Sequence, residues 1–364
     1  MITPITLLNI NEYQKTFTIE IDKTVQKVKD FVNFENISIL FTLGIAMVNI
    51  NFAIITASCY LSYKIITIFY KMCNKPVVHD SKKFLEGYKS LRYPVRQRAL
   101  IDAFNQTKVA CTYGFKVLGK DVFLDKNLQK KCIDETFVFT PKDIKGVRNR
   151  KNHKMTIEVV NEDTFYQAEK MINQGYNPLV LNMANQYHPG GGVESGSRAQ
   201  EESLFRRSNY FQSLYNVKSS YPLDEYGAVY SPHVQVFRKS EKDGLEFQKP
   251  FEISCIAAAA YDLGKISISK KQYDLGTKEK IRSILRVAKI KGHDSLVLGA
   301  LGCGAFRGNP KTVSKLFKEV LNENEFNKSF RKISFAIFDD QNAKQGSNFQ
   351  NFKNTFRRSF FNLF

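Results

Sequence analysis

Two adjacent glutamates, Glu201 and Glu202, are the residues of this sequence best suited to acid–base chemistry. A spacer of seven residues separates Gln200, which precedes them, from three consecutive glycines at 190–192. Glycine lets backbone amides approach a ligand closely and adopts dihedral angles that other residues avoid. A carboxyl group packed beside a bound phosphate and a second carboxylate holds its proton more tightly. The stretch 182–208 therefore suits a phosphate-bearing ligand held beside a general acid.

A second glycine-rich loop, GALGCGAFRGN, occupies residues 299–309. Like the first loop it follows an apolar run, and it leads into a helix predicted to begin at Pro310. Helix N-termini and exposed backbone amides bind anions, so the two loops together predict a phosphate-binding site. Cleavage of a glycosidic bond fits such a site, because the leaving oxygen must be protonated. Taken singly, each loop is also explained by a tight turn, and the two glutamates by a favourable first helical turn.

Strands that alternate with helices are predicted around both loops. Apolar or β-branched runs indicate strands at 155–160, 179–181, 226–238, 253–256, 295–298 and 333–338. Apolar residues at helical spacing, or turn and capping residues, indicate helices at 93–109, 164–175, 200–215, 278–290, 310–321 and 348–361. This alternation predicts an α/β sandwich whose ligands bind at the carboxyl ends of the strands.

The composition limits the classes of partner. Of the 364 residues 43% are hydrophobic, which allows a packed core and argues against global disorder. The formal net charge of +19 favours anionic partners, although an abundance of lysine alone also explains it. Because the lysines are scattered, we expect no sequence-specific binding of nucleic acid. The six cysteines include no C-x-x-C pair, so the sequence predicts no metal site or disulfide framework and favours a reducing compartment.

Residues 37–63 contain no charged side chain. The run exceeds the roughly 20 residues that a helix needs to cross a bilayer, and it predicts a transmembrane helix. Asn49 and Asn51 favour the alternative of a buried or interfacial helix, because unpaired amides are costly in hydrocarbon. Lysines that follow the run predict a membrane-associated protein with its catalytic domain in the cytoplasm. They are Lys64, Lys71, Lys75, Lys82 and Lys83.

We predict three segments along the chain. They are an N-terminal region at 1–75 that holds the hydrophobic helix, a linker at 76–90, and a catalytic domain at 91–364.

The motif VLNMANQYHPGGG, followed by seven residues and QEE, resembles the signature of the microbial type of poly(ADP-ribose) glycohydrolase. The matching segments IEVVNEDT, YSPHVQVFR, GALGCGAFRGNP, FAIFD and NFQNF extend the resemblance over about 91–361. It implies a macrodomain-like fold, a three-layer α/β sandwich around a mixed central sheet. It also implies hydrolysis of the ribose–ribose O-glycosidic bonds of ADP-ribose polymers, which releases ADP-ribose and reverses ADP-ribosylation without a metal or cofactor.

The resemblance further implies roles for individual residues. Glu202 would protonate the departing ribose oxygen and then activate water, and Glu201 would hold the ribose hydroxyls. His188 we interpret as a loop residue, and the segment ISCIAAAAYDL at 253–263 departs from the proline-bearing segment of the family pattern at the adenine side. The expected ADP-ribose contacts are Asn185, Gly190, Gly191, Gly192, Gln200, Gly302, Gly304, Ala305 and Phe306.

Two other functions stay open at this stage. One is a non-catalytic module that binds ADP-ribose, and the other is an enzyme that removes single ADP-ribose units from proteins. The intact QEE argues against the first, since a binding module needs no acid at that place. Expected partners are poly(ADP-ribose) or ADP-ribosylated proteins and the product ADP-ribose, and we expect the protein to be a monomer.

Overall fold

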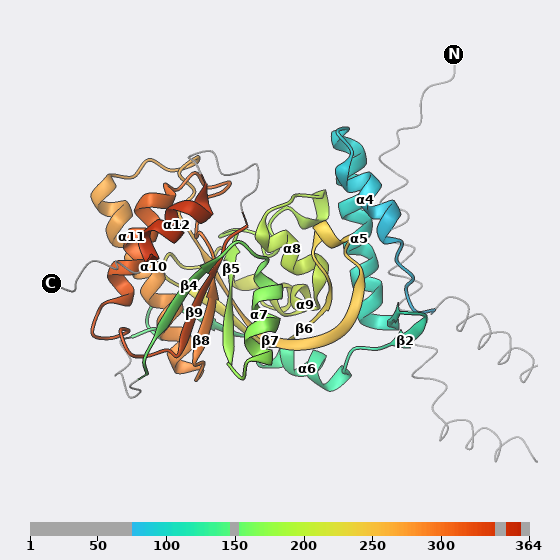
Figure 1. Ribbon diagram of the computed structural model, residues 1–364, viewed down its shortest axis with the longest axis horizontal. Coiled ribbons are helices and arrows are strands. Elements are labelled where there is room, and N and C mark those ends of the chain that lie inside the picture. The colour runs from blue at the N-terminus through green and yellow to red at the C-terminus, as the bar shows by residue number, and fades with distance from the viewer. Residues whose placement is uncertain (1–74, 146–152, 339–346, 358–364) are drawn as a thin grey trace, which may run out of the picture. The chain divides into compact units, whose positions relative to one another are not determined.

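The computed structural model describes residues 75–145, 153–338 and 347–357 (Figure 1). The chain divides into two compact units, Met1–Asn74 and Lys75–Phe364. The predicted transmembrane helix at 37–63 and the rest of the first unit lie outside the described residues. Within the described ranges no helix is both long and apolar enough to cross a bilayer.

A seven-stranded mixed sheet forms the centre of the unit Lys75–Phe364. β5 pairs in parallel with β7 and β8, whereas β6 pairs antiparallel with both β3 and β7. The predicted α/β fold with a mixed central sheet is thus confirmed. In spatial order the strands are β3 (Phe137–Phe139), β6 (Ala228–Arg238), β7 (Phe247–Ala259), β5 (Pro178–Ala184), β8 (Ser295–Leu298), β9 (Lys332–Ala336) and β4 (Thr156–Val160).

Helices cover both faces of this sheet (Figure 1). One face carries α10 (Lys270–Ile290), α11 (Pro310–Leu321) and α12 (Asn348–Phe356). The other carries α5 (Tyr93–Tyr113), α6 (Lys126–Asp134), α7 (Thr164–Asn173), α8 (Gln200–Arg207) and α9 (Tyr210–Asn216). Short 3₁₀ turns occur at η1 (Val193–Ser195), η2 (Lys218–Ser220) and η3 (Glu241–Asp243).

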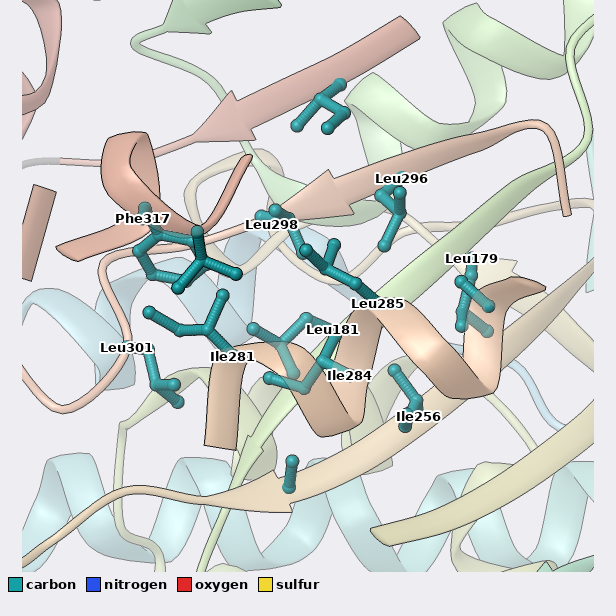
Figure 2. Close-up of a cluster of buried hydrophobic side chains, with 14 of the residues drawn as sticks. Leu179, Leu181, Ile256, Ile281, Ile284, Leu285, Leu296, Leu298, Leu301 and Phe317 are labelled. Atoms are coloured by element: carbon teal, nitrogen blue, oxygen red, sulfur yellow. The ribbon is translucent and has the colours of Figure 1, made fainter. Parts of the chain in front are cut away.

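The alternation of side chains along β5 divides the core into two clusters. Leu179 and Leu181 point to one face and Val180 to the other, as successive residues of a strand do. Figure 2 shows the first two among side chains of α10, α11 and β8: Ile281, Ile284, Leu285, Leu296, Leu298 and Phe317. Both clusters consist of residues of Lys75–Phe364, which gives this unit a core of its own, as in a domain that folds independently.

Capping side chains explain where several helices begin. Asp163 accepts a hydrogen bond from the backbone N–H of Tyr166 at the start of α7. Ser269 and Gln272 form a reciprocal capping box at the start of α10. Asn309 caps α11, whose first residue is a proline that lacks an N–H to satisfy.

Three segments differ from the sequence-based prediction. The predicted linker at 76–90 contains helix α4 (Ser81–Lys89), which packs on α5 through the buried Phe84 and belongs to the compact unit. The helix predicted at 200–215 is interrupted at Ser208, which bridges to Val236 of β6. A small hairpin of β1 (Phe115–Val117) and β2 (Lys120–Val122) follows α5 and was not predicted.

Candidate active site

Gln200 fastens the start of α8 to the end of β5. Its side-chain Oε1 accepts a hydrogen bond of 2.9 Å from the backbone N–H of Met183. Its Nε2 donates a bond of 2.7 Å to the carbonyl oxygen of Leu181. Both ends of the amide therefore bind the strand, and the side chain sets the position of the first helical turn. That turn contains Glu201 and Glu202, as the sequence predicted.

Glu201 is hydrogen-bonded to the first glycine loop and to β5. The side chain is buried, and its Oε1 accepts hydrogen bonds from Asn182 Nδ2 at 3.2 Å and from the N–H of Gly190 at 3.1 Å. Its Oε2 accepts a third from the N–H of Asn185 at 2.8 Å. Three N–H donors thus converge on one carboxylate. Such convergence favours its charged form and holds the loop at 185–190 against the helix.

Glu202 is buried as deeply but has fewer partners. Its Oε1 accepts a hydrogen bond of 2.9 Å from the N–H of Gly192. Its Oε2 is buried and has no hydrogen-bond partner among the described residues. A buried polar atom without a partner costs stability and calls for an explanation, such as a bound ligand.

Gly191 allows the loop to lie against both carboxylates. Its φ of 54° falls in the left-handed region, which favours glycine. A Cβ at this position would lie 2.6 Å from Oε1 of Glu202 and 3.3 Å from Oε2 of Glu201. Any other residue would displace the two acids, so the glycine run is required by the geometry of the pair as well as by any ligand.

The Glu201 carboxyl holds its proton near neutral pH. Burial raises the pKa of Glu201 to about 8; the N–H donors around it act against this rise, and the charge of Glu202 adds to it. Three donors stabilise a negative charge on Glu201, whereas no donor reaches Oε2 of Glu202. Among the described residues, Oε2 of Glu202 is therefore the oxygen of the pair that a ligand could engage.

The second glycine loop leaves the same edge of the sheet as the first. It follows β8, which is the parallel neighbour of β5, and a Cβ on Gly299 would lie 3.0 Å from Cε of Met183. Gly302 has a φ of 75°, and its Cβ would lie 2.7 Å from that of Ala260. A Cβ on Gly304 would meet no protein atom within 4 Å, so one side of this residue faces open space. Ala305 is exposed and Phe306 is half-buried.

Residues 105–239 match the family described as microbial-type PARG, catalytic domain. The solved poly(ADP-ribose) glycohydrolase of Thermomonospora curvata is 24% identical with a TM-score of 0.64, covering 71% of this chain and 99% of its own. That of Deinococcus radiodurans in complex with ADP-ribose is 29% identical with a TM-score of 0.58, covering 65% and 99%. No curated protein sequence matches. The predicted family resemblance is confirmed.

The match to the PARG family includes the first glycine loop and the carboxylate pair and ends before the second loop. Asn185, expected at the distal ribose of a PARG ligand, uses its Oδ1 within the loop. That atom accepts hydrogen bonds from the N–H groups of Tyr187 at 2.8 Å and His188 at 3.1 Å. His188 itself is exposed, consistent with its interpretation as a loop residue.

Asn182 is the part of this PARG-like site that we did not predict from the sequence. It lies on β5, is fully buried, and donates to Glu201, while its own Oδ1 has no partner among the described residues. The sequence feature that could have revealed Asn182 is an amide side chain within an otherwise apolar strand, because a buried amide needs polar partners. Across the same described ranges, no group of three or more His, Cys, Asp or Glu side chains is arranged to hold a metal ion.

Proposed function

We propose that this protein is a poly(ADP-ribose) glycohydrolase that hydrolyses ribose–ribose O-glycosidic bonds and releases ADP-ribose. The observation that carries the proposal is the unpaired, buried Oε2 of Glu202 beside a Glu201 whose two oxygens are already bound. The match to microbial-type PARG supports it, as does the likeness to the Deinococcus glycohydrolase, which was solved with ADP-ribose.

Glu202 acts as the general acid and then as the general base. Its Oε2 donates a proton to the departing ribose oxygen as the glycosidic C–O bond breaks and the anomeric carbon becomes oxocarbenium-like. The resulting carboxylate then takes a proton from water, whose oxygen bonds to the anomeric carbon. Glu202 thereby regains its proton. Glu201 holds the loop in place by accepting hydrogen bonds from the N–H groups of Gly190 and Asn185.

The glycine loops hold the diphosphate and the sugars of the substrate. Gly302, Gly304 and Ala305 offer backbone amides next to the start of α11, where an anion is favoured, and Phe306 packs on the reacting sugar. Gly190 to Gly192 line the other side. We assign Gln200 and Asn185 to positioning, because the hydrogen bonds of their side chains hold the strand, the loop and Thr164.

Incubation of the unit Lys75–Phe364 with labelled polymer tests this assignment. The wild type is expected to release free ADP-ribose, and Glu202→Gln is expected to release none, since glutamine keeps the acceptor for Gly192 but cannot supply the proton. The matched control is Glu194→Gln, an exposed glutamate of the same loop that pairs with Lys108. Equal release by the wild type and Glu202→Gln would overturn the role of Glu202.

The same experiment separates the other two functions. A protein that binds the polymer without releasing any product would be a binding module. Release of single units from a mono-ADP-ribosylated protein, with the polymer left intact, would indicate a mono-ADP-ribosyl-protein hydrolase.

The uncharged run at 37–63 and the lysines after it support a membrane-anchored enzyme with its catalytic unit in the cytoplasm. Extraction of membranes with carbonate tests the anchor. The full-length protein should stay in the membrane pellet, and its release into the soluble fraction would remove this part of the proposal.

A further inference from the structure

The hairpin β1–β2 presents an exposed leucine at its tip. Leu118 and Gly119 form a two-residue turn between Val117 and Lys120, and their φ angles are 47° and 79°. Turns of this kind prefer Asn-Gly, because the left-handed region crowds the Cβ of most other residues. Leu118 is also 93% exposed. The leucine is thus unfavourable for the local backbone and gains no burial within the described unit, which suggests that it contacts something outside this unit.

Apolar and basic side chains surround this tip. Phe123 is 61% exposed and lines, with Leu118, Lys120 and Lys249, an open groove of about 610 Å³. Neither lysine has an ion pair within the part of the chain that the structure describes. We call Leu118, Phe123, Lys120 and Lys249 the hairpin patch.

The carboxylates near the hairpin patch are already engaged. Asp121 pairs with Lys116 at 2.5 Å. Asp125 lines the groove, but its carboxylate caps α6 by accepting from the N–H of Asn127 at 2.8 Å. The patch therefore offers apolar side chains with a basic surround, a combination that suits an anionic lipid surface.

The chain enters the catalytic unit at the base of this hairpin. Val77 donates to the carbonyl oxygen of Gly114 at 2.9 Å, and its own carbonyl accepts from Lys116 at 3.0 Å. The uncharged run ends at Tyr63, so the chain from there to Lys75 reaches at most about 40 Å when fully extended. An anchor at 37–63 would therefore limit the distance between the start of the catalytic unit and the bilayer to about 40 Å.

We propose that the hairpin patch is a membrane-contact surface. Leu118 and Phe123 insert among the headgroups of an anionic bilayer, and Lys120 and Lys249 face the lipid phosphates. The inference rests on the proposed anchor and is independent of the proposed catalytic activity. Because the anchor raises the local concentration of bilayer to the millimolar range, a weak contact is enough to orient the domain.

The hairpin patch is separated from the first glycine loop by most of the length of α5. Gln97, near the start of α5, donates to the carbonyl oxygen of Ser195 beside the first glycine loop. The hairpin follows the other end of α5, after Tyr113 (Figure 1). At 1.5 Å per residue these two ends are separated by ~24 Å along the helix. The hairpin patch and the first glycine loop therefore lie near opposite ends of α5.

The absence of tryptophan from the sequence provides a direct test. Leu118→Trp introduces a single reporter into the full-length protein, which is placed in nanodiscs that contain 30% phosphatidylserine. We expect a blue-shifted tryptophan emission that brominated lipids quench. In nanodiscs of pure phosphatidylcholine, the blue shift and the quenching should both be smaller. The matched control is Leu275→Trp on α10, where the native side chain is 58% exposed, and it should remain unquenched.

Several results would overturn the inference. Equal quenching of the two tryptophan reporters, or no quenching of either, would refute the contact. A blue-shifted emission at position 118 in the absence of lipid would mean that another part of the protein covers this side chain. Concentration-dependent dimers that bury the reporter would assign the patch to a second copy. If the protein does not enter nanodiscs, the same reporter is read with phosphatidylserine vesicles, where quenching supports the contact and its absence refutes it.

A double variant separates this inference from the catalytic one. Leu118→Ser with Phe123→Ser should lower vesicle binding of Lys75–Phe364 about tenfold or more, because two apolar side chains no longer leave water. Its turnover of soluble polymer should equal that of the wild type. Unchanged vesicle binding would refute the contact, whereas an inactive wild type that still binds vesicles would refute only the catalytic proposal.

Discussion

Replacement of Glu201 by glutamine should change the stability of the protein in a way that depends on pH. The folded protein holds the proton of this group up to a pKa of about 8, whereas the unfolded chain loses it near 4.5. The stability contributed by the protonated carboxyl is therefore fully present below pH 4.5 and is lost as the pH rises through 8. The difference between the two pKa values corresponds to about 5 kcal/mol. Glutamine cannot ionise, so the variant lacks this loss.

The substitution also has a cost that does not depend on pH. Glu201 accepts three N–H bonds through two oxygens, and glutamine has only one acceptor oxygen. Its NH₂ group would face one or two N–H donors, which costs about 1–3 kcal/mol. We therefore expect Glu201→Gln to be less stable than the wild type at pH 5 and more stable at pH 9, with the two free energies of unfolding equal at an intermediate pH.

Urea unfolding of the unit Lys75–Phe364, followed by circular dichroism from pH 5 to pH 9, measures this crossover. Glu194→Gln is the matched control, because this glutamate is exposed and should show no such trend. A difference between Glu201→Gln and the wild type that stays constant over this range would refute the reasoning. Glu201 would then not hold its proton up to pH ~8 in the folded protein.

Two further predictions concern activity. The kcat/KM for polymer hydrolysis should fall above pH ~8, because Glu201 loses its proton there. Glu201→Gln cannot ionise at this position and should not show this fall. Gly191→Ala should lower kcat at least about 100-fold, because its Cβ would lie 2.6 Å from Oε1 of Glu202 and displace the acid. The circular dichroism spectrum should be retained, and an active variant would contradict the close packing of the loop against Glu202.

The fold could be predicted from the sequence wherever local patterns determine it. Apolar runs such as 295–298 became strands, and the spacing of apolar residues located α10 and α11. Helix α4 was missed because only one of its residues, Phe84, is buried, so its charged sequence resembles a linker. The order of the strands and the antiparallel pairing of β3 depend on contacts between distant segments, which no local pattern contains.

The site, like the fold, could be predicted from the sequence only where local patterns determine it. Residue types and spacing predicted the two loops and the first-turn glutamates. They did not predict that Glu201 is bound by Asn182, Gly190 and Asn185, because those bonds depend on the path of the loop. That path uses positive φ angles at Gly190 and Gly191, which a glycine run permits but does not specify.

The three side chains of the QEE motif have different partners, so each of them has a separate role in the site. Gln200 binds the strand and Glu201 binds the loop, whereas one buried oxygen of Glu202 has no donor among the described residues. Leaving that oxygen unpaired costs about 1–3 kcal/mol, which a binding module could avoid by placing an apolar residue there. Loops that only bind a diphosphate need no proton at this position. The cost is explained if Glu202 transfers a proton to the ligand that those loops hold, which is why the geometry favours a hydrolase over a binding module.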